Sequence, residues 1–304
     1  MTPRTPGDRR NMASVTVVIP AYNSASFLEE TLQSALDQTD PPESIVVVDD
    51  ESPDDSFAVA KKVAATNPSI QAVRRKNGGA CAARNTGLAM AKTEFVLFLD
   101  ADDRLLSRAI EHHLAVMERH SEAVMVFGSN HVISAEGARI GKSIVPDQDV
   151  TLEDLAMTVT PCPSQCLYRR STVQQVGGMN ETLRPGDEID LNMRLLRLGK
   201  IISYPEFVME YRSHPNQGTK NRLTNSSAHL RALELNIGPK GTSPDPALYK
   251  RARRKWLARY GHRQHMAALG AIRHGRFKEV IPATRLALAS YWARIRRAEW
   301  HPKH

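Results

Sequence analysis

The sequence predicts an α/β fold built on a Rossmann-like sheet, because short apolar runs alternate with amphipathic stretches over the first hundred residues. The apolar runs have the length and β-branched content of buried strands and end in polar or turn-forming residues. The predicted strands are Val15–Ile19, Ile45–Val48, Ile70–Val73 and Phe95–Leu99. We expect them to be parallel, with their carboxyl ends at one edge, where open α/β sheets bind ligands.

The stretches between these runs carry helix start signals. Ser26 and Glu29 have the spacing of a capping box, and Gly78 and Gly79 turn the chain into a third helical stretch. The predicted helices run over 26–37, 52–66 and 80–91. Crossover helices of this kind are what parallel strands require.

From Leu105 to Tyr211, the predicted helices and strands no longer alternate regularly. We expect a helix over 107–119, a strand over 123–127, a hairpin around Glu136 and Gly137, and a helix over 187–198. The predicted organisation is a disordered leader at 1–14, an α/β domain at 15–220, a linker at 221–246 and a basic helical extension at 247–304.

Composition indicates an ordinary globular protein. The 304 residues are 41% hydrophobic and 24% charged, and no run of eighteen apolar residues occurs. The start of the chain lacks the apolar segment of a secretory signal. The three cysteines do not have the spacing of a zinc site. We therefore expect a cytoplasmic protein with reduced cysteines.

Positive charge is concentrated in the tail. Residues 241–304 hold 15 Lys and Arg against 3 Asp and Glu, a net +12, whereas residues 1–240 hold 26 against 30, a net −4. The α/β domain must therefore bind any anionic ligand through local devices such as a metal ion, a helix N-terminus or a few placed side chains.

Acidic residues follow the fourth predicted strand in a D-x-D arrangement. In extended geometry the side chains of Asp100 and Asp102 point the same way and could bind one divalent cation. Carboxylate oxygens suit Mg²⁺ or Mn²⁺, which would also hold a diphosphate. The alternative is a solvated acidic turn, but the position after an apolar strand favours the metal interpretation.

Asp49 and Asp50 end the second predicted strand. A carboxylate there can accept hydrogen bonds from a nucleobase or from ribose hydroxyls. An Asx turn or an N-terminal helix cap is an equally simple interpretation, and the two roles are compatible.

The glycine stretch KNGGACAARNTG contains neither G-x-G-x-x-G nor G-x-x-x-x-G-K-[ST]. Dinucleotide enzymes and P-loop nucleotidases are therefore disfavoured. Arg84, on the helix after the glycines, could contact a pyrophosphate, although a lone helical arginine is commonly a solvated surface residue.

Three later residues also have a structural interpretation. Asp187 and Glu188 could serve only to stabilise the dipole of their helix, and His214 could be purely structural.

Six motifs occur together in one order. They are VTVVIPAYN, IVVVDDESPDDS, KNGGACAARNTGLAMA, FLDADD, VGGMNETLRPGDEIDLNMRL and YRSHP. In this combination the chain resembles the family 2 glycosyltransferases of the GT-A fold, from Val15 to Pro215.

The resemblance implies an inverting, metal-dependent hexosyltransferase that uses a nucleotide-sugar donor, with a UDP-sugar favoured. It places Pro20, Ala21, Tyr22, Asp49 and Asp50 around the base and ribose. It further implies that Arg84 lies near the phosphates, that Asp100 binds ribose or metal, and that Asp102, with Asp103 and His214, holds Mn²⁺ or Mg²⁺.

The chain departs from the family pattern at two places. Members usually carry Glu-Asp at the start of the late helix, with the second residue as general base, whereas this chain has Asp187 followed by Glu188. Glu188 falls at the base position, and the choice between the two stays open. Members often have a serine soon after the histidine, whereas Gln217 and two further residues that are not serine follow His214 here.

Two other functions compete with this interpretation. A sugar nucleotidyltransferase shares a nucleotide fold and a metal aspartate, but it would carry a Gly-rich basic loop where this chain has PAYN. A degenerate family member could act as a non-catalytic binding module, which the reversed Asp187-Glu188 order favours and the intact acidic motifs oppose.

The implied acceptor is a glycan or lipid-linked hydroxyl in cell-surface polysaccharide synthesis.

The tail has two interpretations. It is either a helical extension packed through its apolar face with a solvated basic rim, or a peripheral contact with anionic lipid at the inner membrane face. Nucleic acid is not expected as a partner, because no recognised binding motif accompanies the basic residues. The predicted apolar face comprises Leu248, Tyr249, Ala252, Trp256, Leu257 and Tyr260.

Overall fold

The structure is a computed structural model that describes residues 14–158, 161–183, 187–215, 217 and 222–273. Apart from Ser14, the predicted disordered leader lies outside the described residues, as does the part of the predicted extension beyond Arg273. The chain divides into two compact units, and each is described by itself. The first lies within Met1–Val150, Pro161–Met179 and Leu195–His214, and the second within Thr151–Thr160, Asn180–Arg194 and Pro215–His304.

The first unit contains a mixed sheet in the order β3-β2-β1-β4-β9-β6-β10-β5. Its first four strands are parallel, as predicted: β1 (Val15–Ala21), β2 (Ser44–Asp49), β3 (Ile70–Arg74) and β4 (Phe95–Phe98). β9 (Cys166–Arg169) runs antiparallel to both β4 and β6 (Ala123–Ile133). The predicted Rossmann-like α/β sheet is therefore confirmed, and it is mixed because β9 enters between β4 and β6.

The remaining strands extend the sheet. β6 and β10 (Lys200–Arg212) pair in parallel over most of their length, and β7 (Arg139–Ser143) pairs with β6 across a turn containing Gly137, whose φ is +88°. The hairpin predicted around Glu136 and Gly137 is therefore confirmed. Two short strands, β5 (Arg104–Leu105) and β8 (Gln148–Asp149), pair antiparallel with β10. β6 is longer than the predicted 123–127 because pairing with β7 and β10 continues it to Ile133.

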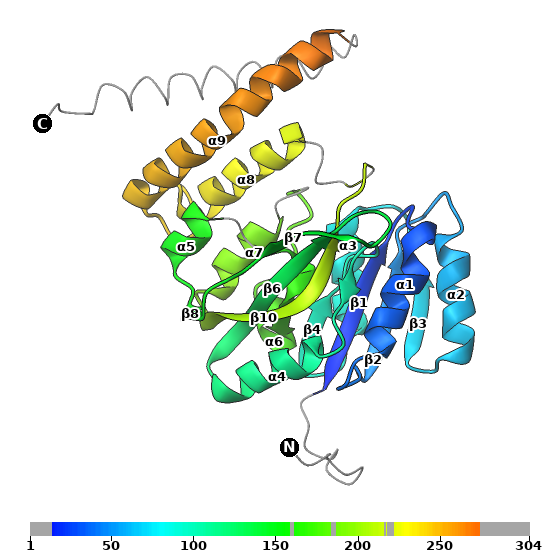
Figure 1. Cartoon of the computed structure of the whole chain (residues 1–304). Helices are drawn as coiled ribbons and strands as arrows, with labels where there is room; N and C mark the ends of the chain where they lie inside the picture. Colours follow the sequence, from blue (N-terminus) through cyan, green and yellow to red (C-terminus); the bar gives the residue numbers. More distant parts are fainter. Residues whose placement is uncertain (1–13, 159–160, 184–186, 216, 218–221, 274–304) are drawn as a thin grey trace, which may run out of the picture. The chain divides into compact units, whose positions relative to one another are not determined.

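Helices cover both faces of the parallel part. α1 (Ala25–Leu36) packs beside α2 (Ser56–Thr66), while α3 (Ala80–Met90) packs on β1 and β2 (Figure 1). The strand order reverses between β1 and β4, and right-handed crossovers then place α3 on the face opposite α1 and α2. This reversal creates the ligand-binding edge typical of doubly wound sheets. α4 (Ala109–Arg119), η2 (Pro163–Gln165) and α6 (Arg170–Gln175) complete this unit.

The predicted capping box at Ser26 and Glu29 is wrong. α1 begins at Ala25, with Ser24 at the N-cap position and no side-chain cap. Its first amide instead donates to Asp54 Oδ2 at 2.9 Å, a residue of the loop before α2. α2 in turn begins at Ser56 rather than at 52, since the preceding loop is used for such contacts. At α1 a tertiary hydrogen bond has replaced a local cap, whereas the first amide of α2, that of Ser56, donates to Asp54 Oδ1 two residues earlier at 3.1 Å.

The second unit is helical. It contains α5 (Leu152–Met157), most of α7 (Asp187–Leu195), α8 (Arg222–Ile237) and α9 (Pro246–Arg273). α8 lies within the segment 221–246 that the sequence predicts as a linker, and the predicted domain bounds stay a prediction. Leu248, Ala252, Trp256 and Leu257 of α9 are buried, and Trp256 Nε1 donates to the Ala156 carbonyl at 2.8 Å. The apolar face of α9 is thus used in packing against α5 and α8.

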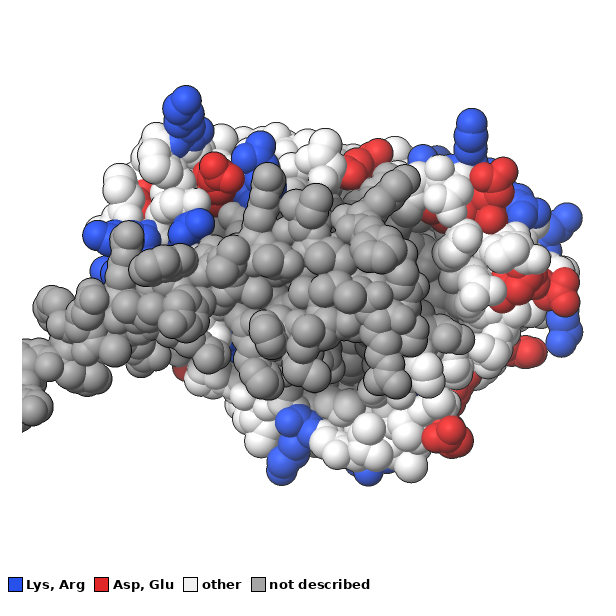
Figure 2. Space-filling model, turned by 90° about the horizontal axis from the view of Figure 1, so that it is seen from above, with Lys and Arg blue, Asp and Glu red and all other residues white. Residues whose placement is uncertain are grey.

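Among the described residues, no helix combines the length and apolar character needed to cross a membrane. In Figure 2, acidic and basic side chains lie next to one another over the described surface visible in that view.

Stability of the first unit should depend on pH through His113. This residue of α4 is fully buried, its Nδ1 lies 2.7 Å from the Tyr204 hydroxyl, and burial lowers its pKa to about 3. Between the ordinary pKa of about 6.5 and the folded value, the unfolded chain binds a proton that the folded chain does not, so stability falls as pH falls through this window. The loss through His113 between pH 7 and pH 5 should be about 2 kcal/mol.

Urea unfolding of the full chain at both pH values tests this. The double variant His113→Phe, Tyr204→Phe removes the titrating group without leaving an orphaned hydroxyl, so it should lose less stability on acidification than the wild type. His229, whose pKa is also lowered to about 3, remains in both proteins as an internal control. Equal losses in the two proteins would contradict the assignment.

Candidate functional site

The candidate site lies where β1, β2 and β4 end at the carboxyl edge of the sheet. Pro20 and Ala21 are buried in β1, and the next residue, Tyr22, is 55% exposed. Asn23 and Glu51, just past β1 and β2, have positive φ values of 51° and 62°. A non-glycine residue in this region costs energy and needs support from its surroundings. Such strain at two neighbouring strand ends is typical of a functional site.

Asp50 organises the glycine loop before α3. Its side chain is 2% exposed and pairs with Arg75 at 2.6 Å. The amide of Gly78 donates to it at 3.0 Å and the amide of Gly79 at 2.5 Å. The carboxylate thus occupies the N-terminal end of α3, where helix amides would otherwise attract a phosphate. Sequence reasoning missed Arg75, although a basic pair directly after β3 was a visible signal.

The neighbouring Asp49 has a different environment. Its side chain is fully buried, and Oδ2 lies 3.0 Å from Arg74 Nε and 3.3 Å from the Ser52 amide. Asp49 therefore fixes the chain after β2, which agrees with the Asx-turn alternative, while its predicted contact with a nucleoside stays a prediction.

Asp100 to Asp103 form a turn rather than an extended strand end. β4 stops at Phe98, and the Asp103 amide donates to the Asp100 carbonyl at 3.1 Å. The predicted parallel orientation of Asp100 and Asp102 is therefore wrong in its geometry. The turn sends the two carboxylates to different partners on different elements.

Asp100 pairs with Arg84 of α3. Arg84 Nη2 lies 2.5 Å from Asp100 Oδ1, and the arginine side chain is only 8% exposed. The alternative of a solvated surface arginine is thus excluded. Because the Asp100 side chain remains 29% exposed, the pair presents a partly accessible anion beside a buried cation at the edge of the sheet.

Asp102 pairs with His214, which follows β10. His214 Nε2 lies 2.8 Å from Asp102 Oδ2, and the imidazole packs on the Phe27 ring with centroids 5.0 Å apart. Burial, and next the charge of Asp100, raise the pKa of Asp102, while the hydrogen bond from His214 opposes that rise. The structure thus brings His214 and Asp102 together, while their predicted role as metal ligands stays a prediction.

Asp103 is enclosed by protein groups. Its side chain is fully buried, Oδ1 accepts the Arg212 amide at 2.9 Å, and Oδ2 accepts the Ser164 hydroxyl at 2.8 Å. Burial, followed by the charges of Asp102 and Asp100, raises its pKa well above the usual range. These contacts favour a structural role for Asp103 over the predicted metal-ligand role. Ser164 was missed because nothing in its local sequence marks it, and Arg212, although it lies in the YRSHP motif, was missed because the motif does not show which groups it contacts.

Asp187 and Glu188 begin α7 in the second unit, and Glu188 is half-buried. The choice of general base between them stays a prediction. Within the described part of the chain, no three His, Cys, Asp or Glu side chains lie so that they could together hold a metal ion. A cation at this edge would therefore need ligands from a substrate as well, which is how Mg²⁺ is commonly bound beside phosphates.

Comparison with known proteins identifies the class. Residues 16–177 match the model of glycosyl transferase family 2, so the chain belongs to this family.

Particular relatives agree with that class. Over 211 residues the chain is 28% identical to the putative teichuronic acid biosynthesis glycosyltransferase TuaG of Bacillus subtilis, covering 68% of this chain and 82% of that protein. It is 27% identical over 227 residues to an uncharacterized glycosyltransferase of Rickettsia felis, covering 72% of this chain and 37% of that protein. The chain thus spans well under half of the longer relative.

A solved structure supports the fold. S. aureus TarS, crystallised in complex with UDP-GlcNAc, aligns with a TM-score of 0.66 at 20% identity, covering 89% of this chain and 79% of that chain. Together with the family match, this confirms the predicted GT-A fold.

Asp50→Asn should loosen the glycine loop. An amide in place of the carboxylate loses the charge beside Arg75 and one acceptor for the two glycine amides, so the free energy of unfolding should fall by about 2 kcal/mol. Hydrogen exchange at Gly78 and Gly79 should accelerate.

The matched control is Asp154→Asn, which changes a half-buried carboxylate at the start of α5 that also accepts backbone and hydroxyl hydrogen bonds. It should leave the exchange of both glycine amides unchanged. Unaltered exchange in Asp50→Asn would show that the loop does not depend on this carboxylate.

Proposed function

We propose that this chain transfers a sugar, with inversion, from a nucleoside-diphosphate donor to a hydroxyl of a glycan or lipid-linked acceptor in cell-surface polysaccharide synthesis. The observation that carries the proposal is the turn at the carboxyl edge of this family 2 domain. In it, Asp100 pairs with Arg84 and Asp102 pairs with His214. The UDP-GlcNAc bound by TarS and the teichuronic acid assignment of TuaG support a UDP-sugar and a polysaccharide product. A cytoplasmic location follows from the expected donor.

A divalent cation fits this edge. Asp102 and His214 supply oxygen and nitrogen donors 2.8 Å apart, and their side chains are 25% and 12% exposed. Burial first, and next the repulsion between neighbouring carboxylates, raises the pKa of Asp102 and Asp103, and a bound cation would relieve that repulsion. We therefore propose Asp102, with His214, as the ligands of Mn²⁺ or Mg²⁺. The ion would neutralise charge on the diphosphate leaving group.

The chain's own residues account for the remaining tasks. Tyr22, exposed beside the end of β1, offers a ring on which a nucleobase can stack. Arg84 is held beside the diphosphate region by Asp100. A carboxylate of α7, Glu188 by position, takes the proton of the acceptor hydroxyl as its oxygen bonds to the anomeric carbon. The bond from that carbon to the diphosphate breaks in the same step, and the nucleoside diphosphate leaves with the electron pair.

A donor panel tests the proposal. The wild-type chain, supplied with Mn²⁺ and a set of nucleotide sugars, should release nucleoside diphosphate from one of them, with UDP-sugars first. Asp102→Ala should lower that release by about 10²-fold or more, because it removes a ligand of the cation that would neutralise charge on the leaving group. Turnover that persists at wild-type level in Asp102→Ala with a chelator present would refute the metal assignment.

The same assay assigns the base. Glu188→Gln should reduce transfer by roughly 10² to 10⁴-fold yet leave donor binding unchanged, since the carboxylate acts on the acceptor. Asp187→Asn is the matched control, one residue away on the same helix. An active Glu188→Gln with an inactive Asp187→Asn would move the role to Asp187.

We further propose a peripheral contact between the tail and anionic lipid at the inner membrane face. Up to Arg259, the cationic side chains of α9 are exposed, while Leu248, Ala252, Trp256 and Leu257 are buried within the second unit. Attraction to a membrane would therefore be electrostatic rather than by insertion, and salt should weaken it. The exposed cations are Lys250, Arg251, Arg253, Arg254, Lys255 and Arg259.

Co-sedimentation of the full chain with anionic and neutral vesicles tests this contact. Replacing Arg253, Arg254 and Lys255 by Gln should weaken binding to anionic vesicles on the order of 10²-fold at low salt, at about 1 kcal/mol per cation. A control that replaces the exposed Lys61, Lys62 and Lys92 by Gln removes the same charge elsewhere and should bind like the wild type. Equal binding of all three proteins, or none to anionic vesicles, would leave the tail as a packed helical extension.

A further inference from the structure

The acidic turn after β4 is held by a guanidinium that the proposed chemistry does not use. Arg212, the last residue of β10, has a side chain only 2% exposed. Its Nε donates to the main-chain carbonyl of Asp102 at 2.8 Å, and its Nη1 donates to the carbonyl of Ala135 at 2.8 Å. Its backbone amide donates to Asp103 Oδ1 at 2.9 Å. One residue thus contacts two consecutive members of the turn.

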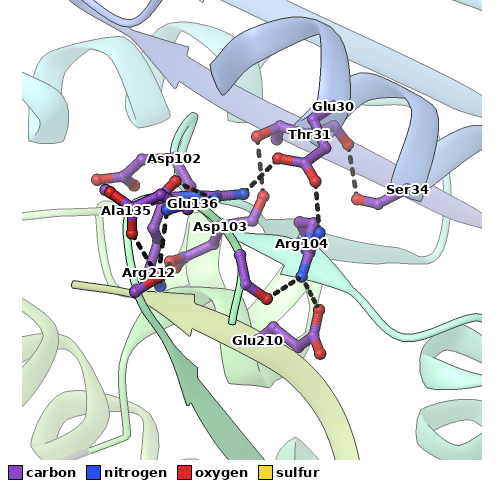
Figure 3. A network of polar contacts seen from close by, with 12 residues as sticks. Glu30, Thr31, Ser34, Asp102, Asp103, Arg104, Ala135, Glu136, Glu210 and Arg212 are labelled. Carbon is purple, nitrogen blue, oxygen red and sulfur yellow. Dashed lines mark hydrogen bonds and ion pairs between the residues drawn. The ribbon is translucent and has the colours of Figure 1, made fainter. Parts of the chain in front are cut away.

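An ion-pair network links this guanidinium to α1. Arg212 Nη2 pairs with Glu30, whose carboxylate also pairs with Arg104, and Arg104 pairs with Glu210 at 2.6 Å (Figure 3). Thr31, the next residue of α1, donates its hydroxyl to the carbonyl of Asp103 at 2.8 Å. The turn is therefore fastened to α1 on one side and to the end of β10 on the other.

Arg212 and His214 act on the same aspartate from positions two residues apart. Arg212 holds the Asp102 carbonyl, while His214 contacts the Asp102 carboxylate at 2.8 Å. The Phe27 ring supports both, since it lies 4.9 Å from the guanidinium carbon and packs on the imidazole. Main chain and side chain of Asp102 are thereby fixed together.

Burying a guanidinium lowers the stability of the fold unless its N–H groups form hydrogen bonds. An apolar side chain at a buried position commonly gives a similar free energy of unfolding. What an apolar residue cannot supply is directional donors to several carbonyls, and lysine lacks the planar fork that reaches them simultaneously. The contacts of Arg212 therefore define the position of the turn more than they add stability.

We propose that Arg212 is a positioning residue for sugar transfer: it sets the main chain of Asp102 so that the Asp102–His214 pair is in place before the donor binds. The proposal rests on the donor-site role of Asp102 proposed above. Preset geometry matters because a displacement of about 1 Å in a catalytic group can cost roughly 10²-fold in rate.

The test compares Arg212→Lys with the matched control Arg169→Lys. Arg169 pairs with Glu94 at 2.7 Å, donates to the carbonyl of Ser121 at 3.3 Å and lies 5.1 Å from the Phe95 ring. These are the same kinds of contact, but Phe95 begins β4, so they lie at the opposite end of that strand from the acidic turn.

Three measurements are made on each full-length variant: hydrogen exchange over 99–105 without ligand, the Kd for UDP with Mn²⁺, and kcat/KM for the donor identified in the panel. Arg212→Lys should accelerate exchange in 99–105, weaken UDP binding about tenfold and lower kcat/KM roughly 10²-fold. Arg169→Lys should lower the Tm similarly and leave all three near wild type. Glu30→Gln, which changes a side chain 45% exposed, should give a smaller effect in the same direction even where Arg212→Lys does not fold.

A stable Arg212→Lys with wild-type exchange, Kd and kcat/KM would overturn the proposal, and so would equal losses in Arg212→Lys and Arg169→Lys. If the wild-type chain binds no UDP and turns over no donor, the proposed function fails. The exchange measurement, which needs no ligand, then still decides whether Arg212 positions the turn.

Discussion

The site depends on how negative charge is balanced at one edge of the sheet. Five aspartates lie at the ends of β2 and β4, in or beside the interior, where unpaired charge is costly. Each has a partner on another element: Asp49 has Arg74, Asp50 has Arg75 and the glycine amides, Asp100 has Arg84, Asp102 has His214, and Asp103 has Ser164 and the Arg212 amide. Because these partners come from β3, α3, η2 and the end of β10, the carboxylates also tie the unit together.

This arrangement separates structural carboxylates from those that face outward. Asp49, Asp50 and Asp103 are almost completely buried, whereas Asp100 and Asp102 retain partly exposed side chains beside a buried arginine and a half-buried histidine. The second group is therefore better suited to meet a ligand. Phosphate binding by the amides of α3 would compete with Asp50, so the diphosphate is expected to depend on Arg84 and on the Asp102–His214 pair instead.

The carboxylates proposed for the donor site and the two candidates for the general base belong to different units. The paired carboxylates belong to the sheet-containing unit, whereas Asp187 and Glu188 begin α7, a helix grouped with α5, α8 and α9. The grouping of residues 151–158, 180–183 and 187–194 with α8 and α9 could not be foreseen from the sequence, because it depends on packing between segments far apart along the chain.

Sequence by itself determined the alternation of strands and helices, the four parallel strands, the acidic ends of β2 and β4, and the family motifs. Local patterns of apolar periodicity and turn residues predict these features, because each pattern lies within one short stretch of chain. Tertiary structure decided what each charged side chain contacts. Ser26 and Glu29 look like a cap, yet Asp54 supplies the acceptor. Asp100 and Asp102 look as if they point the same way, yet they lie in a turn. Nothing local marks Ser164 or shows which groups Arg212 contacts. The physical reason is that a buried polar group must find a partner wherever the fold brings one within reach, and that partner can be more than a hundred residues away.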